Sequence, residues 1–193
     1  MIPLLVIRHA PTGWNVDRRI QGRADVPLGE TGRAQARAGR LPRGWDGARC
    51  LSSPLSRALE TARLLGLDPQ PEPRLIEMDW GDWEGRRVAE LRAELGKVMA
   101  ENEAHGLDFR PPGGESPREV QKRLRPLLAE LAGPTIFVTH KGVLRALYAL
   151  ATAWDMRSDP PEKLADRCAH SFELAPDGTL AVIELNIPLG PAP

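Results

Sequence analysis

The sequence is poor in the features that mark several large classes of protein. Of its 193 residues only two are cysteines, Cys50 and Cys168, which is too few for a disulfide framework. No apolar run is long enough to cross a membrane. The apolar start at residues 2–7 is interrupted by Arg8 and His9, so it is too short for the core of a signal peptide. These absences favour a cytoplasmic protein. The sequence leaves undecided whether the two cysteines form a single disulfide bond.

An excess of charge of either sign is also missing. The 26 Lys and Arg residues balance the 26 Asp and Glu residues, so the formal net charge is +0. Proteins that bind nucleic acid or anionic lipid generally present a strong basic field, so we expect neither a nucleic-acid nor a membrane partner. Only four of the cations are lysines. The many arginines suit bidentate binding of phosphate, but codon usage explains their abundance equally well.

The composition supports a folded chain, because 41% of the residues are hydrophobic and 27% are charged. Apolar runs alternate with helical patterns, which predicts an α/β fold: a three-layer α/β/α sandwich with a mostly parallel central sheet. The expected strands are residues 2–7, 48–51, 74–76 (at an edge), 135–139 and a closing hairpin of 171–174 and 180–185. The expected helices are residues 30–40, a helix capped by Ser53, a helix capped by Ser116, and residues 142–151. We expect residues 188–193 to be frayed.

One stretch does not follow this alternation. Residues 80–114 lack clear strands and lie between two segments rich in Gly and Pro, so we interpret them as a short helical insertion over the carboxyl ends of the strands. Residues 86–104 are expected to be helical, with Gly96 as a weak point. Pro126 is expected to kink or split the helix that Ser116 begins. Together, residues 1–193 are predicted to form one domain with this insertion.

The chemistry is expected where the strands end, because ligands of open α/β sheets bind beyond the carboxyl ends of the strands. The first strand ends at Arg8 and His9, and residues 135–139 are followed by His140. Arg57 lies near the start of a helix, so it can reach an anion placed there. Glu77 follows the third apolar run. Two arginines, two histidines and a carboxylate in one cleft indicate phosphoryl transfer without a metal.

Each of these residue types has a role in such a reaction. A neutral imidazole nitrogen attacks phosphorus near pH 7. Arginines neutralise the phosphate and the charge of the transition state. A protonated carboxyl group supplies a proton to the leaving alkoxide, which requires burial that raises the pKa of Glu77.

Several ordered motifs point to one family. Residues 8–15 read Arg-His-Ala-Pro-Thr-Gly-Trp-Asn, residues 22–28 read Gly-Arg-Ala-Asp-Val-Pro-Leu, and residues 52–58 read Ser-Ser-Pro-Leu-Ser-Arg-Ala. Further matches are Leu-Ile-Glu at 75–77, Trp-Glu-Gly at 83–85, Pro-Gly-Gly-Glu-Ser at 112–116 and Val-Thr-His at 138–140. In this order the blocks resemble the histidine phosphatase superfamily, in the phosphoglycerate mutase-like branch with an Arg-His-Gly motif.

The resemblance implies a role for each matching residue. His9 corresponds to the nucleophile, Glu77 to the proton donor, and Arg8, Arg57 and His140 to the groups that hold the phosphate. Asn15 and the backbone near Thr12 and Gly22 complete the phosphate pocket. The family needs no cofactor and no metal for this chemistry, and its substrates are phosphorylated molecules.

Two positions depart from the family pattern. Ala10 stands where Gly is usual, and a position that needs positive φ would disfavour Ala. Lys141 stands where Gly is common after the second histidine, and its ammonium group can add a substrate contact. Neither change removes a reacting group, so we expect activity to be retained.

Three functions stay open at this point. The first is a metal-independent phosphomonoesterase acting on a small phosphorylated metabolite through a phosphohistidine at His9. The second is a phosphoglycerate mutase, although the mutases follow the proton donor with Arg-His-Tyr-Gly and this chain reads Met-Asp-Trp-Gly at 78–81. The third is a phosphate-binding protein without activity. The oligomeric state stays open, and the candidates for substrate selection are Arg23, Trp80, Arg86, Arg87 and Glu103.

Overall fold

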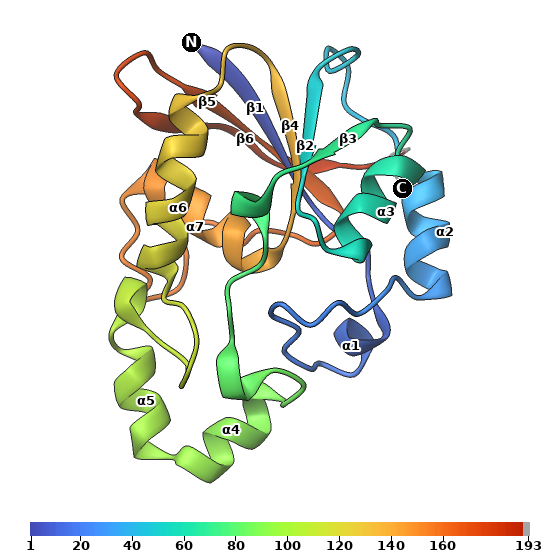
Figure 1. The fold of residues 1–193 in the computed structure, drawn as a ribbon. Coiled ribbons are helices and arrows are strands. Elements are labelled where there is room, and N and C mark those ends of the chain that lie inside the picture. Colours follow the sequence, from blue (N-terminus) through green and yellow to red (C-terminus); the bar gives the residue numbers. More distant parts are fainter. Residues whose placement is uncertain (191–193) are drawn as a thin grey trace.

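The computed structural model describes residues 1–190, which form a six-stranded mixed sheet with helices on both faces (Figure 1). The strand order is β3-β2-β4-β1-β5-β6, with β3, β2, β4 and β1 parallel and with β5 and β6 antiparallel to their neighbours. The strands are β1 (Ile2–Arg8), β2 (Arg49–Ser52), β3 (Pro69–Pro71), β4 (Thr135–Thr139), β5 (Cys168–Leu174) and β6 (Leu180–Pro188).

The sheet separates two hydrophobic layers, because successive side chains of a strand point to opposite faces. Leu4 and Val6 of β1 belong to the core cluster that includes residues of α6 (Pro117–Ala129) and α7 (Lys141–Thr152). Leu5 and Ile7 belong to the cluster that includes residues of α3 (Ser56–Leu64). With α2 (Glu30–Ala38), α3 covers this second face (Figure 1). The predicted three-layer arrangement with a mostly parallel sheet is therefore confirmed.

The insertion lies beyond the carboxyl ends of the parallel strands (Figure 1). It contains the 3₁₀ turn Gly81–Trp83, α4 (Val88–Leu95), α5 (Lys97–Glu103) and the 3₁₀ turn Gly106–Asp108. The expected single helix over residues 86–104 is broken at Gly96, whose φ of 50° ends α4 and precedes α5. Trp83, Leu91 and Met99 form a small hydrophobic cluster of their own with Ile20.

Several local expectations were wrong. The helix after β2 begins at Ser56 and not beside Ser53, because Ser53 Oγ accepts from the Leu55 amide and holds Pro54 outside the helix. Residues 73–75 form a 3₁₀ turn capped by the Glu72 carboxylate, and the edge strand is β3 instead. Pro126 does not split α6, since it lies on the exposed face where water can satisfy the carbonyl that loses its amide partner.

The remaining helix is short. α1 (Gly13–Val16) follows β1, and Thr12 is its N-cap.

At the other end of the chain Pro188 is the last residue of β6, so regular structure extends one residue into the tail that was expected to be frayed. Residues 191–193 of that tail lie outside the described residues. Cys50 and Cys168 are both free thiols. Among residues 1–190 no helix is long and apolar enough to cross a membrane.

Candidate active site

His9 and His140 meet at the carboxyl ends of two neighbouring parallel strands. Arg8 of β1 pairs with Thr139 of β4, so the residue that follows each strand lies at the same level of the sheet. The His9 amide donates to the Thr139 carbonyl at 2.8 Å, and the two imidazole rings lie 5.1 Å apart, centre to centre. His9 is 6% exposed and His140 is 0% exposed. The strand register therefore brings the two predicted histidines together.

The surroundings of His9 keep its imidazole neutral. Burial lowers the pKa of His9 well below its usual value, and the charges of Arg8 and Arg57 lower it further. Nδ1 of His9 lies 2.7 Å from the Ala10 carbonyl oxygen. Because a carbonyl oxygen only accepts, Nδ1 must carry the proton, and Nε2 is left with a free lone pair.

His140 is neutral for similar reasons. Burial and then the neighbouring His9 and Arg57 lower its pKa well below the usual value. Its Nε2 lies 2.7 Å from Ser53 Oγ, and its Nδ1 is buried without a partner among the described residues.

The two predicted phosphate-binding arginines come from different elements. Arg57, the second residue of α3, is fully buried and donates to the carbonyls of Gly22 at 2.8 Å and Ala24 at 2.7 Å. The residue that follows this 22–24 loop, Asp25, accepts from the amide and hydroxyl of Ser56, so the loop that Arg57 contacts lies at the start of α3. Arg8, the last residue of β1, forms an ion pair with Asp166.

Three buried nitrogens at this place have no partner within residues 1–190: Nε of Arg8, Nε of Arg57 and Nδ1 of His140. The two Nε atoms are donors, and Nδ1 of His140 is a donor in the tautomer whose Nε2 accepts from the Ser53 hydroxyl. Buried polar groups are rarely left unpaired, and each costs about 1–3 kcal/mol. A ligand with several acceptor oxygens would satisfy them, which favours a phosphate group next to His9.

Glu77 follows the 3₁₀ turn Pro73–Leu75 and is 8% exposed. Its carboxylate oxygens accept from the Met78 amide at 2.8 Å and from the Gly142 amide at 3.2 Å, near the start of α7. Burial raises its pKa, and these two hydrogen bonds and Arg57 oppose the shift without cancelling it. A Cβ at Gly142 would lie 2.4 Å from Glu77 Oε1, so only glycine fits here without a shift.

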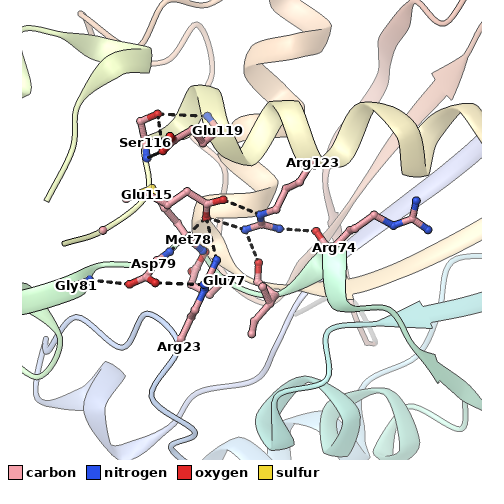
Figure 2. Close-up of polar contacts among 12 residues, drawn as sticks. Arg23, Arg74, Glu77, Met78, Asp79, Gly81, Glu115, Ser116, Glu119 and Arg123 are labelled. Atoms are coloured by element: carbon pink, nitrogen blue, oxygen red, sulfur yellow. Dashed lines mark hydrogen bonds and ion pairs between the residues drawn. The ribbon is translucent and has the colours of Figure 1, made fainter.

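An ion-pair network holds the segment that carries Glu77 (Figure 2). Arg123 of α6 donates to the carbonyls of Arg74 and Ile76, and its Nε donates to Glu115 at 2.9 Å. Arg23 lies 3.2 Å from the Asp79 carboxylate and 3.6 Å from that of Glu115. Residues 74–79 are thus tied to α6 on one side and to the 22–24 loop on the other.

The other predicted phosphate-site residues form the segment between β1 and α2. The Asn15 side-chain oxygen accepts from the amide and hydroxyl of Thr12, which caps α1. Gly22 has a φ of 54°, and an added Cβ would lie 1.8 Å from Glu84 Oε1. The Glu84 carboxylate accepts from the amides of the two residues after Gly22, at 2.6 and 3.0 Å. Glu84 therefore shapes the loop whose carbonyls bind Arg57.

A cavity of about 480 Å³ opens beside these residues. Arg8, His9 and Asn15 line it, together with Lys141. Arg57, Glu77 and His140 do not line this cavity. Ala10 is not among the described non-glycine residues with positive φ, so the backbone there does not require glycine.

The sequence did not single out several residues that support the site. Ser53 contacts His140, and Thr61 accepts from the Ala10 amide at 3.0 Å and donates to the Arg57 carbonyl at 2.6 Å. Ser53 and Glu84 lie inside family motifs, which is a signal for them. Asp166 lies in a segment without a pattern and had none.

All five candidates for substrate selection make contacts within or beside the insertion, Arg23 through its ion pairs with Asp79 and Glu115. Arg86 pairs with Glu94, Arg87 with Glu90 and Glu103 with Arg92, and Trp80 packs on Phe109.

Known proteins resemble this chain along most of its length. A family model described as histidine phosphatase superfamily (branch 1) matches residues 4–186. A glucosyl-3-phosphoglycerate phosphatase of Mycobacterium tuberculosis is 36% identical over 165 residues, which cover 76% of this chain and 73% of the relative. A 2,3-bisphosphoglycerate-dependent phosphoglycerate mutase 2 of Gloeobacter violaceus is 33% identical over 200 residues, covering 95% and 90%. A solved structure of mycobacterial glucosyl-3-phosphoglycerate phosphatase with VO3 has a TM-score of 0.81 at 29% identity, covering 97% of this chain and all of that chain.

Proposed function

The chain belongs to the histidine phosphatase superfamily (branch 1), and from this premise we propose that it is a metal-independent phosphomonoesterase acting on a small phosphorylated metabolite. The observation that carries the proposal is the pair of opposite pKa shifts in one buried site. Burial lowers the pKa of His9 and raises that of Glu77, which shifts each group toward the neutral form that a nucleophile and a general acid use.

The substrate phosphate is bound first. Its oxygens accept from the guanidinium groups of Arg8 and Arg57 and from His140, whose buried donors have no partner in residues 1–190. Asn15 and the backbone near Thr12 and Gly22 complete the pocket. These fixed donors neutralise the phosphate and stabilise the charge of the transition state.

In the first chemical step, Nε2 of His9 attacks phosphorus. The N–P bond forms while the bond from phosphorus to the ester oxygen breaks, and the leaving oxygen takes the proton of Glu77. In the second step, the Glu77 carboxylate takes a proton from water. The water oxygen bonds to phosphorus, the N–P bond breaks, and inorganic phosphate leaves with His9 and Glu77 restored.

Hydrolysis is favoured over the mutase reaction by the position of the insertion. A mutase must keep water away from its phosphohistidine. Of residues 80–114, all of which are described, only Val88 lines the cavity beside His9. The insertion therefore contributes little of the wall of this cavity, which supports hydrolysis over transfer. A cytoplasmic location stays a prediction.

The test is phosphate release from a panel of phosphomonoesters by wild type and His9→Ala, with and without EDTA. We expect wild-type turnover that EDTA leaves unchanged and that His9→Ala lowers at least about a thousandfold, since a covalent nucleophile is lost. Phosphate release by His9→Ala at a rate close to that of the wild type would contradict the assignment of His9 as the nucleophile. If the wild type releases no phosphate from any ester, a coupled mutase assay decides between phosphoryl transfer and a protein that only binds phosphate.

A further inference from the structure

Arg8, the last residue of β1, is held by a carboxylate that has no part in the proposed chemistry. Nη1 of Arg8 donates to Asp166, which lies 158 positions away in the sequence, and the Arg8 side chain is 18% exposed. A guanidinium group has five N–H donors in one rigid plane. An acceptor fixed at Nη1 therefore also fixes the direction of the other donors, and Asp166 is that acceptor.

The contact with Asp166 leaves one edge of the Arg8 guanidinium group free. Nε and Nη2 form this edge, and it is the edge with which Arg33 binds the carboxylate of Glu60 in the same chain. Among residues 1–190, neither Nε nor Nη2 of Arg8 has a partner, and Nε is buried. Two parallel N–H groups match two oxygens of a phosphate. Binding of Asp166 at Nη1 therefore keeps the bidentate edge available for a phosphate.

The segment that carries Asp166 contains no helix or strand between residues 162 and 167, yet it is tied to β6 on both sides of Asp166. On one side the Asn186 side chain accepts from the Ala165 amide at 2.7 Å and donates to the Lys163 carbonyl at 3.1 Å. On the other side the carbonyl of the residue after Asp166 accepts from the Leu189 amide at 3.2 Å. These hydrogen bonds fix the place of Asp166 relative to the sheet.

The backbone at Asn186 directs its side chain toward this segment. Ala169 pairs with Ile187 and Ser171 with Glu184, so two residues of β6 face one residue of β5 and form a bulge. Asn186 lies in the bulge with a φ of 58°, in the left-handed region that Asn tolerates better than most residues with a Cβ. Bulges redirect side chains and are frequent next to active sites, which agrees with a role for this tie in the site.

We propose that Asp166 is a positioning residue, which holds Nη1 of Arg8 so that Nε and Nη2 bind two oxygens of the phosphate at His9. Asn186 in turn holds the segment of Asp166. The charge of Asp166 by itself opposes the binding of a phosphate, because both are anions. The Asp166 side chain is 69% exposed, however, so water and salt screen this repulsion. The inference rests on the proposed function for the place of the phosphate.

The sign of the effect of Asp166→Ala on anion binding tests the proposal. Calorimetry measures the Kd of orthovanadate, an anion with the shape of phosphate, so no turnover is needed. We expect Asp166→Ala to raise this Kd about fivefold, because the Arg8 side chain must then be ordered during binding. Removing a negative charge without an orienting role would instead lower the Kd or leave it unchanged, and either result overturns the inference. Asp159→Ala is the matched control, because Asp159 is exposed on the same connection and does not line the cavity.

A double-mutant cycle shows whether Asp166 acts through Arg8. In the Arg8→Met background, Asp166→Ala should not raise the Kd any further, because the group that Asp166 orients is absent. An equal rise in both backgrounds would mean a general structural effect and would contradict the positioning role.

Asn186→Gly tests the tie to β6. Glycine accepts the positive φ of this position, so the variant removes only the hydrogen bonds of the side chain. We expect the Kd of orthovanadate to rise about two- to threefold, and an unchanged Kd would contradict the role of Asn186. If the wild type binds no orthovanadate, the proposed function itself fails. Binding that Asp166→Ala does not weaken overturns this inference alone.

Discussion

At the scale of single residues, burial shifts the pKa values of the reacting groups in opposite directions. Removing an ionisable group from water disfavours its charged form, which lowers the pKa of an imidazole and raises that of a carboxyl group. His9 and Glu77 are both almost fully buried, and their pKa values shift in these opposite directions. The neutral base and the neutral acid are the forms that the first chemical step uses. One physical cause therefore prepares both groups.

The role of Glu77 predicts a dependence on the leaving group. Glu77→Gln keeps the size of the side chain but cannot supply a proton, so alkyl phosphates should be cleaved about a hundredfold or more slowly. p-Nitrophenyl phosphate has a good leaving group and needs no acid, so its P–O cleavage should slow much less. Pre-steady-state bursts with both kinds of ester measure this first step. Equal losses on both esters would rule out Glu77 as the acid.

Residues at strand ends could be predicted from the sequence, and their partners could not. His9 and His140 follow buried strands, and a parallel sheet brings such ends together. The backbone partners of Arg57, the Gly22 and Ala24 carbonyls, could not be predicted, because they lie 35 and 33 positions away in the sequence. Asp166 pairs with Arg8 across 158 positions of sequence, and no local pattern encodes such a pair.

At the scale of elements, α6 acts on the site through one side chain. Arg123 lies about halfway along this helix and holds the Arg74 and Ile76 carbonyls on the segment that leads to Glu77 (Figure 2). It also holds Glu115, which contacts Arg23 from the 22–24 loop. The side chains of Arg123 and Glu115 are only 17% and 13% exposed, so water screens their ion pair weakly. We therefore regard Arg123 as a positioning residue for Glu77.

Arg123→Met tests this positioning role. The variant keeps the apolar stem but loses the donors, so we expect a loss of about 2 kcal/mol in stability and a lower kcat for alkyl phosphates. KM should change little, and p-nitrophenyl phosphate should be affected less, as for Glu77→Gln. Arg118→Met is the control, because Arg118 lies on the same helix and pairs with the exposed Asp108. A loss that is equal for both esters would indicate a general structural effect only.

The success of prediction differs between kinds of element. The long buried strands and amphipathic helices were found because their periodicity reflects burial on one or two faces. β3 was missed because its three residues, Pro69–Pro71, contain two prolines and no apolar periodicity. The break at Gly96 separates two short helices whose apolar residues pack on the insertion's own cluster, so the sequence shows one continuous pattern.

At the scale of the whole molecule, the sheet buries three of the four histidines. His9, His140 and His170 are all less than 10% exposed, and burial is the main cause that lowers the pKa of each. The unfolded chain binds protons at the ordinary imidazole pKa of about 6.5, whereas the folded chain resists protonation. The free energy of unfolding therefore suffers no loss from these histidines above about pH 6.5, and it falls as the pH decreases from there toward their pKa values in the folded state. Glu77 acts in the opposite sense, because its raised pKa favours the folded state in acid.

His170 allows this linkage to be measured away from the reacting groups. It lies on β5, and burial lowers its pKa to about 4. Between pH 7 and pH 5 it should therefore cost the folded state about 2 kcal/mol. We expect urea unfolding to show that the wild type loses stability over this interval and that His170→Gln loses about 2 kcal/mol less. His105→Gln, at an exposed histidine of the insertion, should follow the wild-type curve. If His170→Gln also follows that curve, His170 is protonated in the folded state and acid destabilisation comes from the other buried histidines.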